Sequence, residues 1–156
     1  MRIKEICSRA VAVATRSTSL REAAHLMREH HVGALVVIDT KEGVARPVGM
    51  LTDRDIVVEV VAATGADPDT LTVGEVMSGE PATVAEDLGV FEAVEVMCDR
   101  AVRRLPVVAA DGRLVGIITL DDLLRVLSTE LAGLSAALQR AGRREVQRRA
   151  PLGKSL

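Results

Sequence analysis

The sequence predicts a mixed α/β fold of the α+β class, in which two tandem β-α-β-β-α repeats pack with pseudo-twofold symmetry. Three observations support this prediction. The chain repeats itself at an offset of about 70 residues, and each repeat contains an apolar pattern of helical spacing and two short β-branched runs. A unit of that size is marginal as an independent core. We therefore expect the repeats to share their apolar sheets.

The internal repeat is clearest where LREAAHLM aligns with VFEAVEVM, which begins 70 positions later. The offset falls to 67 after DTKEGVARPVG, because this loop carries three more residues than its counterpart AADGRLVG. A length change confined to a polar turn is typical of a tolerated insertion. The expected organisation is repeat 1 (1–63), a linker of turn-forming residues (64–72), repeat 2 (73–128) and a C-terminal basic helical tail (129–156).

The elements of each repeat follow from residue spacing, taken in chain order. A short strand is expected in AVAVAT and in ATVAED. Apolar residues then recur at i, i+3, i+4 and i+7 from Leu20 and from Val90, which is the spacing of one buried helix face. The runs ALVVI and VGMLT, like LPVVA and LVGIIT, indicate two buried strands joined by a hairpin-like loop. A second helix is expected in DRDIVVEVVAA and in LDDLLRVL.

Bulk properties exclude several classes of function. The net charge is −2 and the pI about 5.9, which argues against a globally basic nucleic-acid binder. One Phe and no Trp or Tyr leave no aromatic platforms for stacking on bases. No apolar run approaches the roughly 20 residues that span a bilayer, and the N-terminus lacks an apolar signal region. We therefore expect a cytoplasmic protein with no membrane partner. Nucleic acid is an unlikely partner and is kept only as a weaker alternative.

The reactive side chains predict no catalytic residue, no metal site and no enzyme activity. Cys7 and Cys98 are far apart and outside any Cys-x-x-Cys frame. No nucleophile has an evident base beside it. His30 and His31 are adjacent and diverge on a helix, where a helix C-terminus favours them. A surface metal site that includes Glu29 is the weaker alternative.

A Thr-x-x-Asp motif occurs at both strand-to-helix junctions, in GMLTDRDI and GIITLDDL. Its spacing is that of a capping box, with Thr at the N-cap and Asp at N3. Gly49 or Gly116 precedes each motif, where a missing side chain lets another group approach the backbone. A helix N-terminus also favours anions, and an acidic residue can accept ribose hydroxyls. Capping and ligand binding are therefore compatible roles for the same residues.

The repeats resemble CBS domains, which occur as tandem pairs in IMP dehydrogenase, in the regulatory subunit of AMP-activated kinase and in many small free-standing bacterial proteins. The stretches that carry the resemblance are HHVGALVVIDTKEGVARPVGMLTDRDIV and RAVRRLPVVAADGRLVGIITLDDLL, with VGEVMSGEPATVAEDLGVFEAVEVM before the second. They cover roughly residues 3–128. The resemblance implies a pseudo-twofold CBS pair with no obligatory cofactor. It also implies that an adenosine-containing regulatory ligand, such as AMP, ADP, ATP, NAD or S-adenosylmethionine, binds between the repeats.

The resemblance also implies which residues bind that ligand. Two sites are expected, each with a motif Asp on ribose, a motif Thr on ribose or phosphate, and an apolar slot for adenine. The motif residues are Thr52 and Asp55 in one site and Thr119 and Asp122 in the other; the slots are edged by Val13 and Ala14 and by Thr83 and Val84. Phosphate would be bound by Arg103 and Arg104, with Arg54 adding charge. The alternative for each Arg is a solvated side chain or an ion pair with a nearby Asp.

The tail has Leu131, Leu134 and Leu138 at helical spacing, followed by an arginine-rich segment up to Arg149. Its beginning is expected to pack on the core or on a second copy of the chain. Its basic end is either a solvated helix or a docking element for an acidic partner or nucleic acid. The resemblance further implies a homodimer and an unknown effector protein. The alternative to a sensor is a ligand-independent homodimeric interaction module, in which the motifs only cap helices.

Overall fold

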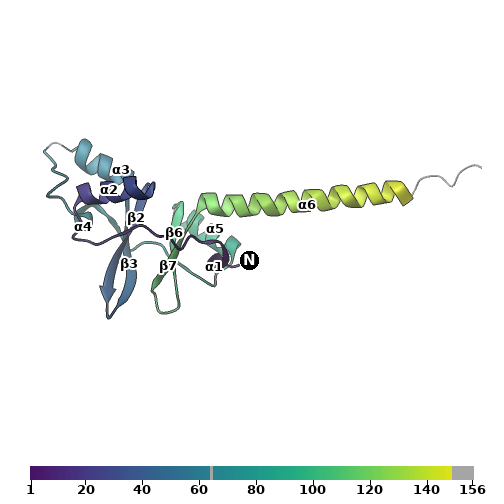
Figure 1. Ribbon diagram of the computed structural model, residues 1–156, viewed down its shortest axis with the longest axis horizontal. Helices are drawn as coiled ribbons and strands as arrows, with labels where there is room; N and C mark the ends of the chain where they lie inside the picture. Colours follow the sequence, from purple (N-terminus) through teal and green to yellow (C-terminus); the bar gives the residue numbers. More distant parts are fainter. Residues whose placement is uncertain (64, 149–156) are drawn as a thin grey trace, which may run out of the picture. The chain divides into compact units, whose positions relative to one another are not determined.

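A computed structural model describes residues 1–63 and 65–148. The chain forms two compact units, Met1–Leu120 and the segment from Asp121 onward, which are described separately. The elements of repeat 1, labelled in Figure 1, are α1 (Ile3–Ile6), β1 (Val13–Ala14), α2 (Leu20–His30), β2 (Ala34–Lys41), β3 (Val44–Thr52), α3 (Asp53–Ile56) and the π-helix η1 (Val57–Val61). Those after the linker are α4 (Val73–Val76), β4 (Ser78–Gly79), β5 (Val84–Ala85), α5 (Val90–Asp99), β6 (Arg104–Val108), β7 (Leu114–Thr119) and α6 (Leu120–Arg148).

The two repeats build two sheets of the same design. The strand orders are β1-β2-β3-β4 and β5-β6-β7. In each sheet the first strand runs parallel to the second, which forms an antiparallel hairpin with the third. Both hairpins shift register at equivalent places, between Val37 and Ile38 and between Val107 and Val108. The duplicated α+β fold predicted from the sequence is therefore confirmed.

The repeats exchange their N-terminal segments. The Ile3 N–H of α1 donates a hydrogen bond to the Leu88 carbonyl (2.8 Å), and the Val73 N–H of α4 donates to the Thr18 carbonyl (2.8 Å). These two contacts are related by the sequence offset of 70 in both donor and acceptor. Helix α1 thus packs with elements of the second repeat and α4 with elements of the first. Each repeat therefore contributes a helix to the other, and this exchange links both repeats within the compact unit Met1–Leu120.

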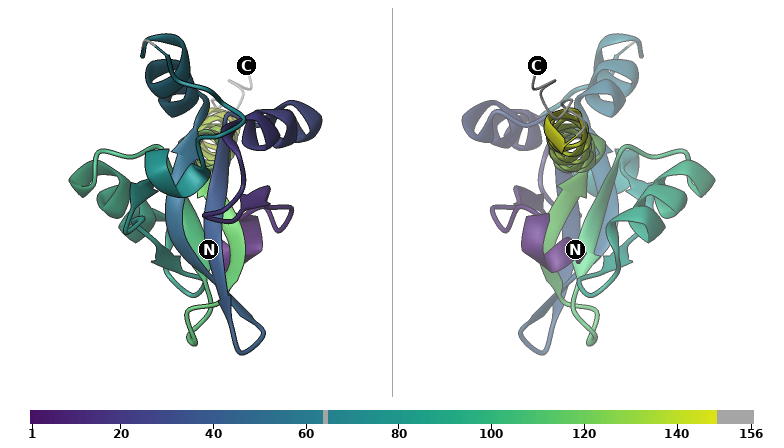
Figure 2. Two further views of the ribbon diagram at one scale, coloured as in Figure 1. Left: turned by 90° about the vertical axis from the view of Figure 1, so that its left-hand side faces the viewer. Right: turned by 90° about the vertical axis from the view of Figure 1, so that its right-hand side faces the viewer.

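The core is aliphatic, as the composition requires. Leu35, Val37 and Leu51 in the first sheet and Leu105 and Ile118 in the second are fully buried. Figure 2 shows the two hairpins at the centre of the first unit, with α2 and α5 on opposite sides. Strands β3 and β7 contact each other. The buried cluster around Leu35 and Leu51 in the first repeat also contains Val73 of the exchanged helix α4. Burial of Val73 there stabilises the association of the two repeats.

Two predicted helices differ from expectation. The helix expected over 53–63 consists of a single α-helical turn followed by η1, and Val61 in η1 is 77% exposed. Its VVEVV run contains four β-branched residues, which crowd an α-helix. The helix expected over 120–127 continues without a break to Arg148.

Residues 149–156, including Arg149, lie outside the described part of the chain. No helix in that described part is long and apolar enough to cross a membrane.

Candidate ligand-binding cleft

A cleft of about 420 Å³ lies where the end of β3 meets segments of the second repeat. This volume is in the range of small-molecule sites. Its walls come from three stretches of chain within the first unit, and the lining residues are Met50, Thr52, Ser78, Gly79, Glu80, Pro81, Ala82, Arg100, Ala101, Val102, Arg103 and Arg104. The exchange of N-terminal segments places Ser78 and Gly79 against β3. The cleft is therefore a product of both repeats.

Thr52 and Asp55 form the predicted capping box at the cleft. The Asp55 carboxylate (Oδ2) accepts hydrogen bonds from the Thr52 N–H at 2.8 Å and from the Thr52 hydroxyl at 2.7 Å. The Thr52 hydroxyl in turn accepts from the Asp55 N–H at 3.2 Å. Local chemistry alone explains this arrangement, because the box satisfies N–H groups that the first turn of α3 leaves without helical partners.

The capping box also fixes what Thr52 can offer to a ligand. A hydroxyl has one proton and two lone pairs. Here the proton points to Asp55 and one lone pair accepts from the backbone, so the remaining lone pair can accept from a donor in the cleft. A sugar hydroxyl is such a donor. In this arrangement Asp55 positions Thr52, which is the motif residue that lines the cleft.

The cleft is electropositive. Arg100 follows the end of α5, Arg103 directly precedes β6, and Arg104 is its first residue. None of these three guanidinium groups forms a salt bridge with another described residue. Glu80 is the acidic residue in the described lining. Three positive charges and one negative charge in a partly enclosed space favour an anion.

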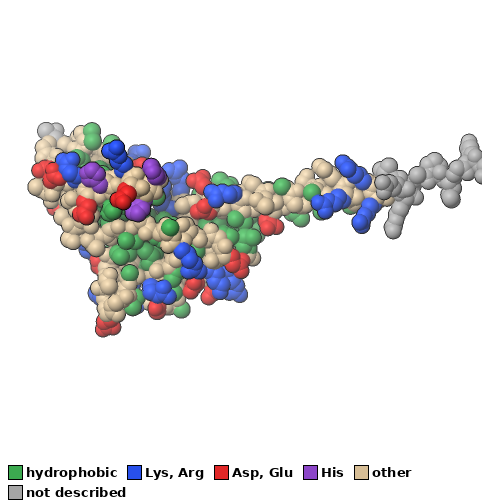
Figure 3. All heavy atoms as spheres, viewed as in Figure 1, with side chains coloured by type: hydrophobic (Ala, Val, Ile, Leu, Met, Phe, Trp, Pro, Cys, Tyr) green, Lys and Arg blue, Asp and Glu red, His purple; other side chains and the backbone are tan. Residues whose placement is uncertain are grey.

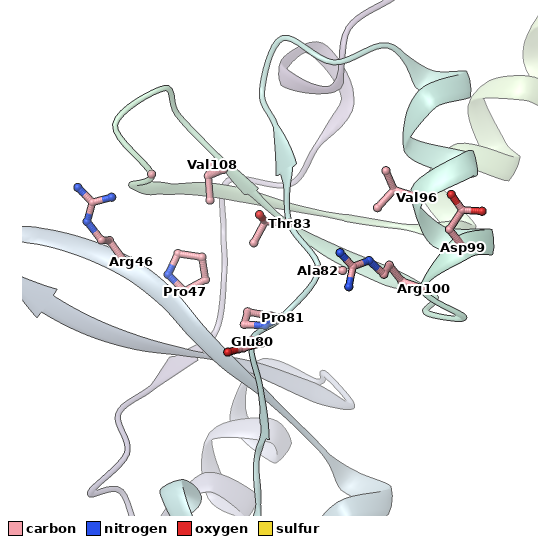
Figure 4. Close-up of a pocket in the computed structure, with 11 residues that line it drawn as sticks. Arg46, Pro47, Glu80, Pro81, Ala82, Thr83, Val96, Asp99, Arg100 and Val108 are labelled. Carbon is pink, nitrogen blue, oxygen red and sulfur yellow. The ribbon is translucent and has the colours of Figure 1, made fainter.

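A second hollow of about 640 Å³ continues from the cleft (Figure 4). The two share Glu80, Pro81, Ala82 and Arg100 in their linings. In Figure 4, Arg46 and Arg100 lie on opposite sides of this hollow, and Thr83 lies between them. The hollow therefore widens the cleft toward Arg46 on β3 and toward the loop that carries Gly112.

The structure brings together only part of the predicted site. Thr52, Arg103 and Arg104 line one cleft, and Thr83 lines the adjoining hollow. The other candidates lie elsewhere. Val13 and Ala14 form β1 beside β2, Val84 is buried in β5, Arg54 is exposed on α3, Thr119 ends β7, and Asp122 lies in the first turn of α6, where it pairs with Arg125 at 3.6 Å.

Several lining residues were not predicted from the sequence. The stretch from Ser78 to Ala82 reaches the cleft because the repeats exchange segments, and spacing within one repeat cannot reveal that. Met50 lies two residues before Thr52 on β3 and shares its face of the strand, and Arg100 follows α5. The Arg100–Arg104 stretch contains three arginines, and this was the one available signal. In the described residues no group of three His, Cys, Asp or Glu side chains is placed to hold a metal ion.

The duplicated fold and the cleft between its halves define a tandem-repeat module. The chain belongs to the CBS domain family, whose model matches residues 3–62 and 73–129. Pairs of CBS domains are typically regulatory.

Known proteins similar to this chain include both sequence relatives and solved structures. An uncharacterised protein of Methanopyrus kandleri, MK0525, is 39% identical over 124 residues, covering 80% of this chain and 61% of that protein. The crystal structure of Hypoxic Response Protein I with two coordinated zinc ions is 38% identical, with a TM-score of 0.69 and coverage of 80% and 98%. That of CBSX2 in complex with AMP is 26% identical, with a TM-score of 0.70 and coverage of 82% and 97%.

Proposed function

We propose that the chain is a regulatory sensor that binds a phosphorylated adenosine ligand in the cleft between its repeats. One observation carries this proposal: an oriented Thr52 hydroxyl lines the same cleft as three arginines that form no salt bridge with another described residue. A sugar needs hydroxyl partners and a phosphate needs cations, and this cleft offers both. The AMP complex of CBSX2, a protein of the same fold, supports the assignment.

The distribution of side chains suggests how the ligand lies. Ribose would donate a hydroxyl hydrogen bond to Thr52, and phosphate would lie against Arg103 and Arg104, whose planar guanidinium groups match phosphate oxygens. Met50, Pro81 and Val102 provide apolar surface for the base. Asp55 acts by holding Thr52 in the accepting orientation, and its second carboxylate oxygen is a further acceptor for ribose.

The charge of the cleft discriminates among the expected ligands. AMP, ADP, ATP and NAD all carry phosphate groups, whereas S-adenosylmethionine carries a cationic sulfonium. We therefore place the phosphorylated ligands ahead of S-adenosylmethionine.

The repeat 1 positions equivalent to Arg103 and Arg104 are Gly33 and Ala34, so the phosphate-binding role is assigned to one cleft. Thr119 and Asp122 remain the proposed counterpart in the second repeat.

A second candidate function is a ligand-independent interaction module. The observation in its favour is that the Thr52–Asp55 capping box is complete without any ligand. In that case Arg103 and Arg104 are simply solvated. Under the sensor proposal, a ligand regulates only if it binds two states of the protein with unequal affinity.

Calorimetric titration of nucleotide-free protein with AMP, ADP, ATP, NAD and S-adenosylmethionine separates the two functions. Losing a charged hydrogen bond costs about 1.5–3 kcal/mol of binding free energy. Arg104→Gln should therefore lower the affinity for phosphorylated ligands roughly ten- to a hundredfold. Arg113→Gln is the matched control, because Arg113 is exposed and lies outside the described lining of the cleft. Absence of saturable binding across the panel would leave the interaction module as the function.

A further inference from the structure

The apolar residues along α6 follow a spacing that differs from that of a helix packed on a globular core. Six apolar residues form a stripe that we call the seam: Leu124, Leu127, Leu131, Leu134, Leu138 and Ala141. Their successive separations alternate between three and four residues, the pattern of a heptad with its mean spacing of about 3.5. An apolar repeat of 3.5 residues is the seam of a left-handed coiled coil, whereas a core-facing helix has a wider stripe of period 3.6.

The seam is exposed along most of its length. Leu131, Leu134 and Leu138 are 65%, 64% and 75% exposed. The 29-residue helix also contains Gly133 and Gly142, which each lower helix propensity. Helices owe most of their stability to packing of an apolar face. A helix of this length with an uncovered leucine seam therefore needs a packing partner.

The charges of α6 are divided between its ends. Asp121, Asp122 and Glu130 against Arg125 make the first part acidic, and Arg140, Arg143 and Arg144 against Glu145 make the later part basic. Figure 3 shows the Lys and Arg side chains gathered toward the end of the helix. Two such helices side by side in the same direction would bring like charges together. Opposite directions bring acidic ends against basic ends and also align the helix dipoles favourably.

We propose that α6 pairs with α6 of a second copy of this chain as an antiparallel coiled coil. Antiparallel pairing has an alignment in which Leu131 of one helix lies level with Leu134 of its partner. Every residue of the seam then faces another residue of the seam, with Leu124 level with Ala141 and Leu127 level with Leu138. This pairing rests on the charge and spacing of α6 alone, and it is independent of what the cleft binds.

Sedimentation equilibrium of the whole chain tests whether the seam drives association. Leu134→Glu places a charge in the centre of the seam and should weaken self-association by about a hundredfold or more. Ala132→Glu introduces the same charge two residues earlier, on the outer side of the helix, and should leave association unchanged. A wild-type monomer, or a Leu134→Glu variant that associates like the wild type, would overturn the proposal.

Distances between spin labels test the direction of pairing. Thr129, Ala136 and Arg143 occupy the same outward position in successive heptads, and each is replaced by Cys in a Cys7→Ser, Cys98→Ser background checked for folding. In a parallel pair the three label-to-label distances are equal. In the proposed antiparallel alignment the Arg143→Cys labels lie about 30 Å apart along the axis and the Thr129→Cys labels about 10 Å, from a rise of 1.5 Å per residue. Three equal distances, or none within range, would contradict the pairing.

Discussion

Gly49 and Gly116 show at the scale of single residues how the two repeats fit together. A Cβ atom on Gly116 would lie 2.8 Å from the Ser8 carbonyl oxygen and 2.9 Å from Cys7 Sγ. A Cβ on Gly49 would lie 3.0 Å from the Ser78 carbonyl oxygen. The group that approaches each glycine is the exchanged segment of the other repeat. The glycines before the Thr-x-x-Asp motifs therefore serve assembly of the fold.

Gly116→Ala should lower the free energy of unfolding by about 1–3 kcal/mol, because the new methyl group overlaps a backbone carbonyl that cannot turn away. Urea denaturation measures this change. Gly79→Ala is the matched control, since a Cβ there meets no atom within 4 Å and Gly79 is on β4, beside Gly49. If Gly116→Ala and Gly79→Ala have equal free energies of unfolding, the segment that carries Cys7 and Ser8 moves away from Gly116 at little cost.

Single residues of the cleft differ in whether the sequence alone could predict them. The Thr52–Asp55 capping box was predictable because it depends on three residues of local spacing. Arg103 and Arg104 were predictable from the resemblance. Arg100 was not, because its proximity to Thr52 depends on how distant segments cross. Met50 was not predicted either, although it shares a strand face with Thr52. The slot expected beside Val13 and Ala14 stays a prediction, since these residues are not in the described lining of the cleft.

At the scale of elements, the exchange of α1 is supported by ion pairs at the surface. Lys4 Nζ lies 2.6 Å from Asp87 Oδ1, and Arg2 lies 3.4 Å from the same oxygen. The hydrogen bond from Lys4, followed by its charge, lowers the pKa of the Asp87 carboxyl. Both cations belong to the N-terminal segment, and Asp87 precedes α5. These pairs therefore join the exchanged segment to the second repeat.

A lowered pKa in the folded state gives stability that is present above the carboxyl's unfolded pKa and is lost as the pH falls through its folded pKa. Asp87→Asn should therefore be less stable than the wild type at neutral pH, and the difference should vanish in acid. Urea denaturation at pH 7 and about pH 3 measures it. Glu95→Gln, at an exposed position without a salt bridge to another described residue, should show no such difference. A deficit of Asp87→Asn that persists unchanged in acid would contradict the ion-pair explanation.

The elements predicted from the sequence are those with a periodic or β-branched apolar pattern. Helices α2 and α5 and the hairpins of both sheets were predicted, because periodicity extends over many residues. Helices α1 and α4 have four residues each and show no period to detect. The unbroken course of α6 was not predicted, because the apolar residues of 120–127 and those of the tail indicate two separate helical segments.

At the scale of the whole molecule, a duplicated sequence has produced a cleft whose walls are not duplicated. The fold obeys the internal symmetry in strand order, bulges and segment exchange. The charges do not, because Arg103 and Arg104 correspond to Gly33 and Ala34. We propose that the symmetric scaffold positions the ligand and that the asymmetric side chains select an anion. Regulation would follow if ligand binding between the repeats favours one packing of the pair.

The methyl resonances of the methionines test nucleotide binding in the cleft most directly. The chain has five methionines, of which Met50 lines the cleft, while Met27 and Met97 are buried in the core. Titration of methyl-labelled protein with AMP should shift the Met50 resonance saturably and leave those of Met27 and Met97 nearly unchanged. A Met50 resonance that does not move at millimolar AMP, or shifts confined to the other methionines, would contradict the central claim.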